Sequence, residues 1–360
     1  MPNFNIVVES QIKESFRVAA LRGLFDVPFL NKNRHEWQVD LPIEDIKWNI
    51  GLIVGASGSG KTTIGKRLFG EKFYHTGFKW SADKSILDCF PDKIKIEEIT
   101  NLLSHVGFSS PPSWTKPFNI LSNGQKFRVE LARILAEGRD LVVIDEFTST
   151  IDRTAAKIGS VALSKTIKRR NKKIVCLSCH KDIVKWLEPD WIYDLDFKKF
   201  LRRKLWRPKI KIQLFRTDYK TWSLFKDNHY LTAQINISAR CYIAFWNDNP
   251  VAFTSCIPMI TLKKTFREHR TVVLPDYQGV GIGIRVSEAL GELLAEEGYK
   301  FRSTTSHPVF IKSRLKSSKW RLVKNPCRGS KKMSWSKSGH DNRNRLTCSF
   351  EFKSETDKLF

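Results

Sequence analysis

Cysteine and methionine are scarce in this sequence of 360 residues, which has seven cysteines and three methionines. The cysteines are odd in number and irregularly spaced, which argues against a disulfide framework and predicts a reducing, cytoplasmic setting. Cys176 and Cys179 form a Cys-x-x-Cys pair within the apolar run KIVCLSC. No second Cys or His pair stands nearby at metal spacing, so we expect a buried strand there instead of a zinc or redox site.

Long apolar runs are also missing, because no stretch reaches 18 apolar residues. This predicts no transmembrane helix and no membrane partner. The first residues, MPNFNIVVESQIKESFRV, lack the basic and then apolar organisation of a signal peptide. We find no internal repeat and no low-complexity tract.

Acidic residues are few relative to basic ones. Asp and Glu number 37 against 62 Lys and Arg, giving a net charge of +25 and a pI near 9.8. Such a balance favours polyanionic partners, with nucleic acid ahead of a membrane surface. A hydrophobic content of 41% supports folded cores. The length predicts two or three domains.

The first half alternates strand-like runs with helical runs. The apolar runs WNIGLIVG (47–54), DLVVIDEF (140–147) and KKIVCLSCH (172–180) are separated by helical patterns such as KFRVELARILAEG. This alternation predicts an α/β fold with a parallel sheet covered on both faces. The segment before residue 45 is expected to form a flanking antiparallel sheet.

A basic stretch marks the domain border. Residues 198–211, KKFLRRKLWRPKIK, hold eight basic residues and no acid, so we divide the chain into domains 1–205 and 206–360. Beyond the border, CYIAFWNDNPVAFTSCIPM predicts a hairpin that turns at Asn247–Pro250. A strand entering a glycine turn and a helix, IRVSEALGELLAEEG, follow.

The segment GASGSGKT, residues 55–62, matches G-x-x-x-x-G-K-[ST] between a strand-like and a helical run, the context that this motif requires. Its glycines let backbone N–H groups turn toward phosphate oxygens, and the helix N-terminus adds its dipole. We expect Lys61 to reach the β- and γ-phosphates of ATP and Thr62 to ligate Mg²⁺. The predicted ATP-binding residues are Gly55, Ser57, Gly58, Ser59, Gly60, Lys61, Thr62 and Thr63.

Two carboxylates end the apolar run DLVVIDEF. We expect Asp145 to hold the Mg²⁺ shell together with Thr62, and Glu146 to polarise the attacking water. In combination with the glycine-rich loop, this pair predicts hydrolysis of ATP.

The segment Leu121–Gln125, LSNGQ, opens a helical run upstream of Asp145. It resembles the LSGGQ signature of the ABC-type ATPases. The resemblance continues through STID, residues 149–152, which is similar to the D-loop, and His180, which is similar to the switch histidine. It covers roughly residues 1–200 and implies a P-loop ATPase domain of this type.

The resemblance also implies an ATP-dependent, head-to-tail homodimer that sandwiches two ATP molecules. His180 would hold the γ-phosphate and the water within its own copy. The residues implied to contact the nucleotide of the other copy are Ser122, Gly124 and Gln125.

Two departures from the ABC pattern bear on coupling. Asn123 replaces the first signature glycine, and we expect Asn to tolerate the unusual dihedral angles of a turn. No clear glutamine marks a Q-loop within residues 80–92, where Asp83 or Asp88 is expected to substitute.

A second glycine-rich turn follows the strand-like run VVLP in the second half. The pattern Q-G-x-G-x-G there resembles the pyrophosphate loop of the GNAT acyltransferases, with coverage of about residues 215–360. It implies an α/β acyltransferase domain that binds acetyl-CoA or another acyl-CoA, with strand 271–274 splayed from its neighbour to pair with pantetheine. A structural strand–helix turn and a Rossmann-type dinucleotide site remain alternatives. The predicted cofactor-binding residues are Val273, Leu274, Gln278, Gly279, Val280, Gly281, Ile282 and Gly283.

Acyl transfer needs a base for the nucleophile and an acid for the leaving thiolate. The candidates are His229 and Tyr230 in NHYL, and Ser306 and His307 in TSHP, the preferred pair. His269 is the further histidine, and it is expected simply to enter the strand before the glycine loop. The tyrosine that many family members carry as the acid is missing from FIKSRLKSSKW.

The acceptor is predicted from charge. Residues 300–345 hold 14 Lys or Arg and one acid, with Trp320 and Trp335 interleaved, which suits phosphate contacts and base stacking. The fusion resembles phage or mobile-element proteins and, distantly, Mom-type acyltransferases that modify DNA. We expect N-acylation of nucleic acid. The alternatives are an ATPase-regulated acetyltransferase of a protein or small molecule, and a nucleic-acid-binding ATPase with an inert second domain.

Overall fold

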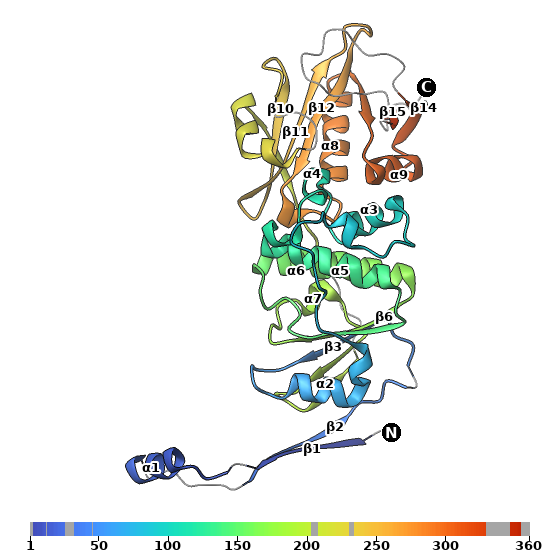
Figure 1. The fold of residues 1–360 in the computed structure, drawn as a ribbon. Coiled ribbons are helices and arrows are strands. Elements are labelled where there is room, and N and C mark those ends of the chain that lie inside the picture. The colour runs from blue at the N-terminus through green and yellow to red at the C-terminus, as the bar shows by residue number, and fades with distance from the viewer. Residues whose placement is uncertain are drawn as a thin grey trace. The chain divides into compact units, whose positions relative to one another are not determined.

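The computed structural model contains two compact units (Figure 1). The first unit comprises Met1–Gly77, Arg139–Ser149 and Ile167–Trp206, and the second comprises Phe78–Gly138, Thr150–Thr166 and Arg207–Phe360. The mixed α/β class predicted from the sequence is confirmed. The predicted border at residue 205 lies outside the described residues, which are 3–11, 13–25, 32–44, 46–202, 208–229, 234–328 and 346–353.

A six-stranded sheet forms the centre of the first unit. Its strand order is β4-β5-β6-β3-β7-β8, and all neighbours are parallel except β7 and β8. The strands are β3 (Ile50–Val54), β4 (Tyr74–His75), β5 (Leu141–Ile144), β6 (Lys173–Ser178), β7 (Trp191–Asp194) and β8 (Lys199–Leu201). The helices of this unit are α1 (Phe16–Phe25), α2 (Lys61–Phe69), α7 (Val184–Leu187) and the 3₁₀ turn Glu71–Phe73.

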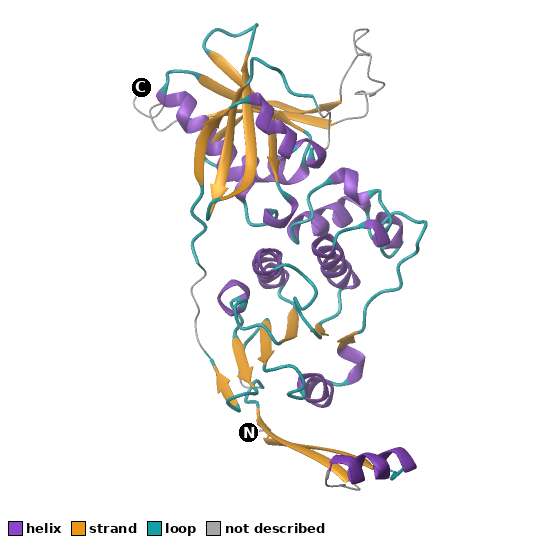
Figure 2. Ribbon diagram, turned by 90° about the vertical axis from the view of Figure 1, so that its left-hand side faces the viewer, coloured by secondary structure: helices purple, strands orange, loops and turns teal. Residues whose placement is uncertain are grey.

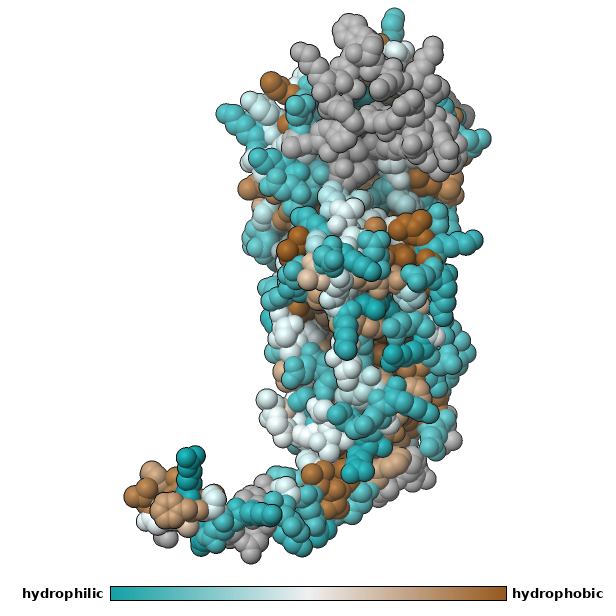
Figure 3. All heavy atoms as spheres, in the orientation of Figure 1, coloured by the Kyte–Doolittle hydropathy of each residue, from teal (hydrophilic) through white to brown (hydrophobic). Residues whose placement is uncertain are grey.

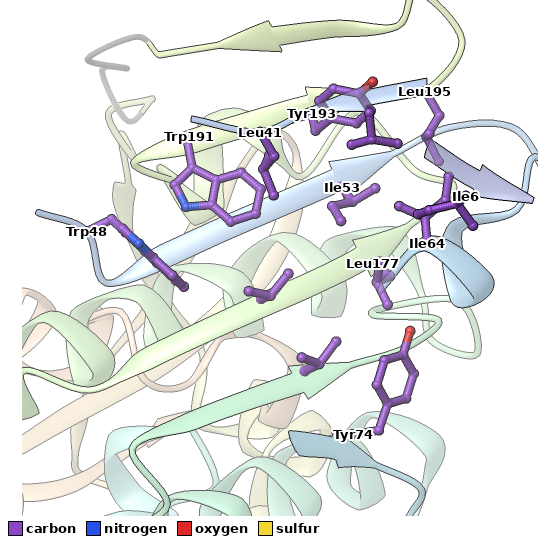
Figure 4. Packing of buried hydrophobic residues seen from close by; sticks show 13 residues of the cluster. Ile6, Leu41, Trp48, Ile53, Ile64, Tyr74, Leu177, Trp191, Tyr193 and Leu195 are labelled. Carbon is purple, nitrogen blue, oxygen red and sulfur yellow. The ribbon is translucent and has the colours of Figure 1, made fainter. Parts of the chain in front are cut away.

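Burial explains why these short runs form strands. Every residue of β3 is buried, as expected for a parallel strand covered on both faces. Trp48 and Trp191 meet edge to face in the core of the unit, with ring centroids 5.5 Å apart (Figure 4). The three apolar runs of the first half therefore do lie in one parallel sheet, as predicted.

A separate antiparallel pair flanks this sheet, which confirms the prediction for the N-terminal segment. Strand β1 (Asn3–Gln11) pairs with β2 (Lys32–Asp40) along their full length. Between them, α1 has no buried residue, and its apolar side chains colour the lower left of Figure 3 brown. Phe16 is 89% exposed.

The second unit contains a seven-stranded sheet of order β14-β15-β13-β12-β11-β10-β9 (Figure 2). All neighbours are antiparallel except β12 and β13. The strands are β9 (Gln213–Thr217), β10 (Arg240–Trp246), β11 (Asn249–Pro258), β12 (Thr265–Val273), β13 (Lys300–Thr305), β14 (Trp320–Arg328) and β15 (Leu346–Phe352). The helices that accompany the sheet are α8 (Ile282–Glu296), α9 (Pro308–Lys316) and the 3₁₀ turns Tyr219–Leu224, Lys226–Asn228 and Pro275–Tyr277.

Strands β12 and β13 diverge, as the sequence predicts. They pair only at residues 265–267 and 300–302, although both strands continue beyond these positions. The predicted hairpin is also present, because β10 and β11 join at Asn247 and Asp248, whose φ angles are 48° and 61°. Two positive φ angles in succession are typical of a tight hairpin turn.

A helical segment from the first half of the sequence belongs to the second unit. It consists of α3 (Ile96–His105), α4 (Pro111–Trp114), α5 (Asn123–Glu137), the 3₁₀ turns Leu87–Cys89 and Phe118–Ile120, and most of α6 (Arg153–Arg170). Ser122 begins α5 with a capping box, in which its Oγ accepts from the Gln125 N–H and the Gln125 side chain accepts from the Ser122 N–H. Within the described part of the chain, no helix is both long and apolar enough to cross a bilayer.

Candidate functional sites

The P-loop joins β3 to α2 in the first unit. Gly60 is the N-cap of α2 with φ 90°, and no side chain caps the helix. A Cβ at Gly60 would lie 2.6 Å from the Trp37 ring, so glycine is required both for the left-handed backbone and for this close approach. The loop thus presents uncapped N–H groups, which suit a phosphate.

Lys61 and Asp196 hold the loop from two sides. The Lys61 Nζ donates to the carbonyls of Gly55 and Ala56 at 2.9 and 2.6 Å, so the amine lies within the loop. The Ala56 N–H donates to Asp196 Oδ1 at 2.9 Å, and Lys181 binds the same carboxylate group at 2.9 Å. These contacts lower the pKa of Asp196, the largest cause being the Ala56 N–H bond.

Trp37 was not singled out from the sequence, yet it lies against the P-loop. Its Nε1 donates to the Ser59 carbonyl at 3.1 Å, and its ring is stacked on His35 with centroids 5.8 Å apart. An indole beside a phosphate cradle can stack on a nucleotide base. The signal available in the sequence was a lone aromatic residue on a polar strand, which is weak.

Thr62 and Asp145 both lie at Tyr74. The Tyr74 hydroxyl donates to the Thr62 carbonyl at 3.1 Å. Burial, and then the charge of Asp145, raise the pKa of Tyr74 well above its ordinary value. Tyr74 is therefore close to both predicted Mg²⁺ ligands.

Glu146 and His180 follow the adjacent strands β5 and β6. Glu146 has a positive φ of 47°, which is uncommon for a residue with a side chain, and its N–H donates to Asp145 Oδ1 at 2.8 Å. Ser178 Oγ donates to the Phe147 carbonyl at 3.0 Å and accepts from the His180 N–H at 3.1 Å. These bonds tie the two segments together, so an acid and an imidazole stand at the same edge of the sheet.

The LSNGQ segment lies in the second unit at the start of α5. Ser122 and Asn123 are exposed. Asn123 replaces the signature glycine without needing that tolerance, because it is the first residue of α5 and has no positive φ. In the predicted Q-loop stretch, Asp83 and Asp88 accept bonds from the nearby Ser81 and Ser85 hydroxyls.

The second glycine-rich loop joins β12 to α8. Gly281 is the N-cap of α8 with φ 94°, and again no side chain caps the helix. A Cβ there would meet nothing within 4 Å, whereas one on Gly283 would lie 3.2 Å from Val273 Cγ2. The Val273 carbonyl accepts from Gln278 Nε2 at 2.9 Å, and the Leu274 N–H donates to the Val251 carbonyl at 2.9 Å.

The predicted proton-transfer residues that the structure describes lie in two places of the second unit, after β13 and after the 3₁₀ turn Lys226–Asn228. Ser306 and His307 follow β13 at the wide end of the divergence, where the His307 Nε2 lies 3.4 Å from the Ser109 carbonyl. Burial lowers the pKa of His307. His229 packs edge to face on Trp222, with centroids 5.5 Å apart, and Tyr230 lies outside the described residues.

The narrow end of the divergence holds residues that the sequence did not single out as a site. His269 lies where the register of β11 and β12 shifts, and its Nε2 accepts from the Asn236 N–H at 3.2 Å. Burial, with Arg270 and Arg267, lowers the pKa of His269 to about 4. Next to it, the Glu268 carboxylate pairs with Arg314 at 2.9 Å and accepts from the Thr271 hydroxyl at 2.7 Å.

The predicted stacking role of Trp320 is wrong. Trp320 is buried in a core cluster with Phe301 and Phe352, and the Arg314 guanidinium lies 4.3 Å from its ring centroid. It cannot stack on a base without unfolding this core. Trp335 lies outside the described residues.

Comparison with known proteins points to two families. The model of the Acetyltransferase (GNAT) family matches residues 186–308. The methionine import ATP-binding protein MetN of Clostridioides difficile (strain 630) is 27% identical over 203 residues, which are 45% of this chain and 63% of MetN. The ribosome protection protein VmlR of Bacillus subtilis (strain 168) is 26% identical over 118 residues, 28% of this chain and 21% of VmlR.

Two solved structures each align with part of the chain. A dimeric bacterial ABC transporter cassette, MJ0796, aligns with 44% of this chain and 84% of its own, at 16% identity and a TM-score of 0.35. A Bacillus subtilis acetyltransferase in complex with CoA aligns with 41% of this chain and 99% of its own, at 13% identity and a TM-score of 0.31. The chain spans under two thirds of both curated relatives. One part of the chain is thus similar to an ABC ATP-binding protein, and another part matches the GNAT acetyltransferase model.

Proposed function

We propose that this chain both hydrolyses ATP and transfers an acyl group from acyl-CoA to an amine. The observation that carries the proposal is the matching start of two helices. Gly60 and Gly281 are both left-handed N-caps, both follow a strand and a glycine-rich loop, and neither helix has a side-chain cap. Each helix therefore presents uncapped N–H groups and the positive end of its dipole to a phosphate. Two such helix starts provide one phosphate site for each of two ligands.

ATP fits the first loop. Lys61 would release its two loop carbonyls to bind the β- and γ-phosphates, and Trp37 would stack on the base. Thr62 and Asp145 would hold Mg²⁺, which neutralises charge on the phosphates. Glu146 would orient and polarise the water, with His180 on the γ-phosphate.

Acyl-CoA fits the second loop, where the open space beside Gly281 and the start of α8 would receive its pyrophosphate. It supplies an acyl group activated as a thioester. Among this chain's residues, His307 is the proposed base together with Ser306, and its lowered pKa keeps the imidazole neutral near pH 7, ready to accept a proton. His269, at the narrow end of the diverging strands, is the competing candidate on geometry.

Nucleic acid is the proposed acceptor, because of the net charge of +25 and the resemblance to phage and Mom-type acyltransferases. A relative named for ribosome protection agrees with a polyanionic partner. We also propose the ATP-dependent homodimer implied by the LSNGQ segment, with the domain border at residue 205.

Nucleoside mass spectrometry tests the acceptor. DNA and RNA from cells expressing the wild type are compared with those from cells expressing Gly281→Glu, whose carboxylate would occupy the pyrophosphate position. An acyl-sized mass increase on one nucleoside, absent with the variant, supports the proposal and identifies the base. Identical spectra, with both proteins folded and expressed, would contradict a nucleic-acid acceptor and favour a protein or small molecule.

A further inference from the structure

The glycine-rich loop proposed to bind acyl-CoA, residues 278–283, is called the acyl-CoA loop. Its first residues pack against the helical segment of the same unit, which contains α3, α4 and α5. A Cβ placed on Gly279 would lie 2.5 Å from the Cα of Gly107, which follows α3. A Cβ placed on Gly107 would lie 2.6 Å from the Gln278 carbonyl oxygen. Two backbones therefore touch at glycines, and neither position leaves room for a side chain.

Arg128 anchors the turn that precedes this loop. It lies on α5, is 1% exposed, and donates to the carbonyls of Pro275 and Asp276, the latter at 2.9 Å. Burial lowers the pKa of Arg128 to about 10, so the guanidinium stays charged at pH 7. Because an uncompensated buried cation is costly, these carbonyls are strongly held in place.

Gln278 fastens the loop on its other side. Its Nε2 donates to the Val273 carbonyl at 2.9 Å, and its Oε1 accepts from the Ser109 N–H at 2.8 Å. One side chain thus links the end of β12 to the connection between α3 and α4. The turn and the first residues of the loop are fixed from both sides.

The second half of the loop is open. Gly281 is exposed, and a Cβ there would have no neighbour within 4 Å. The N–H groups proposed to receive pyrophosphate therefore continue directly from residues that the helical segment holds. Arg128 and Gln278 fix the position of the first half of the loop, and this position determines the direction of the N–H donors that follow.

The anchor and the LSNGQ segment share one helix. Gly124 and Arg128 are four residues apart on α5, hence on the same face. A Cβ on Gly124 would lie 3.3 Å from Asp276 Oδ1. A ligand that holds the start of α5 therefore acts within one helical turn of the loop's anchor.

We propose that α5 couples the two ligand sites, with Arg128 as the positioning residue of the acyl-CoA loop. Nucleotide engaged at Ser122–Gln125 changes the affinity of residues 278–283 for acyl-CoA, and acyl-CoA changes the affinity for nucleotide by the same factor. This inference rests on the proposed function, which supplies both ligands.

Calorimetric titration of the full-length protein tests the coupling. Acetyl-CoA is titrated with and without a non-hydrolysable ATP analogue and Mg²⁺, and the analogue is titrated with and without acetyl-CoA. We expect both Kd values to change by the same factor, about tenfold. In Arg128→Gln each ligand alone still binds, but the other ligand changes its Kd by less than about twofold.

Arg133→Gln is the matched control. Arg133 lies on the same helix, but its guanidinium stacks on Phe78 and Trp80, with ring centroids 4.3 and 4.7 Å away. These partners, and the Lys79 carbonyl to which Arg133 donates, lie outside residues 275–283, so this variant keeps the wild-type factor. Equal loss of coupling in both arginine variants would overturn the assignment to Arg128.

A second pair of variants covers the case in which Arg128→Gln does not fold. Gly107→Ala pushes a methyl group onto the Gln278 carbonyl, whereas Gly138→Ala has a similar positive φ with its nearest neighbour at 4.0 Å. Gly107→Ala should weaken acetyl-CoA binding about tenfold more than Gly138→Ala, with unchanged binding of the ATP analogue. Equal effects of the two variants would contradict the inference.

Hydrogen exchange of the wild type needs no variant. Adding the ATP analogue should change amide protection in residues 273–285, and unchanged protection there would count against coupling. If acetyl-CoA binds the wild type with one Kd in both nucleotide states, the coupling is overturned while the proposed function stands. If acetyl-CoA binds in neither state, the proposed function is overturned, and the inference with it.

Discussion

Arg314 and Glu268 form an ion pair, 2.9 Å apart, that is almost wholly removed from water. Their side chains are 2% and 10% exposed, and they lie on α9 and β12 respectively. Arg314 also donates to the hydroxyls of Ser303 and Ser287 at 2.6 and 2.8 Å. The pair therefore closes the narrow end of the space between β12 and β13, where the two strands part.

Breaking this pair should destabilise the second unit. Glu268→Gln leaves a buried guanidinium without its carboxylate, which costs about 3 kcal/mol in the free energy of unfolding. Urea denaturation measures the loss. Lys319→Ala, which breaks the partly exposed bridge to Glu292, is the control and should cost under about 1 kcal/mol. Similar losses for both variants would contradict the structural importance of the buried pair.

The ATPase assignment predicts a separation of binding from hydrolysis. Glu146→Gln should reduce the hydrolysis rate by about 10²–10⁴-fold, because an amide cannot accept the proton of the attacking water. ATP binding should persist, and gel filtration with ATP should show the proposed dimer. Glu188→Gln is the control, since Glu188 has the same left-handed backbone, φ 48° against 47°. A hydrolysing Glu146→Gln protein would contradict the assigned role.

Two partly buried histidines predict how the free energy of unfolding changes with pH below 6.5. Burial lowers the pKa of His307, and burial with Arg270 and Arg267 lowers that of His269 to about 4. Unfolded histidine takes up a proton near pH 6.5, so the unfolded state binds more protons below that value. The stability is therefore fully present above pH 6.5 and falls as the pH drops toward 4.

Urea midpoints at pH 7, 6 and 5 measure this dependence. His269→Gln and His307→Gln should each flatten the decline, whereas His35→Gln, an exposed residue on β2, should leave the wild-type slope. A slope unchanged in both variants would contradict the burial argument.

The sequence was informative where structure is local. The apolar runs of β3, β5 and β6 and the turn at Asn247 and Asp248 were predicted because periodicity and turn chemistry determine them. Two glycine-rich loops were placed between a strand and a helix, and the structure has both there. The roles of their residues remain predictions.

Contacts between distant segments could not be predicted. Glu268 belongs to the charged stretch TFREHR and looks exposed until Arg314, 46 residues later, supplies its partner. Arg128 donates to the carbonyl of Asp276, which is 148 residues away in the sequence. The sequence around Arg128 in α5 gives no indication of this partner. Trp320 lies in a basic stretch of the sequence, which predicted an exposed ring, but its side chain is buried in the hydrophobic core.

Acetyl-CoA binding to purified wild type, Gly281→Glu and Gly298→Glu tests the central claim most directly. Gly298 also has a positive φ with no neighbour within 4 Å, so it controls for backbone strain. Calorimetry should find one site per chain in the wild type and Gly298→Glu. In Gly281→Glu it should find affinity reduced by about 100-fold, or about 3 kcal/mol, with ATP binding intact in all three proteins. A wild type that binds ATP but not acetyl-CoA, or equal acetyl-CoA affinity in all three, would contradict the second site.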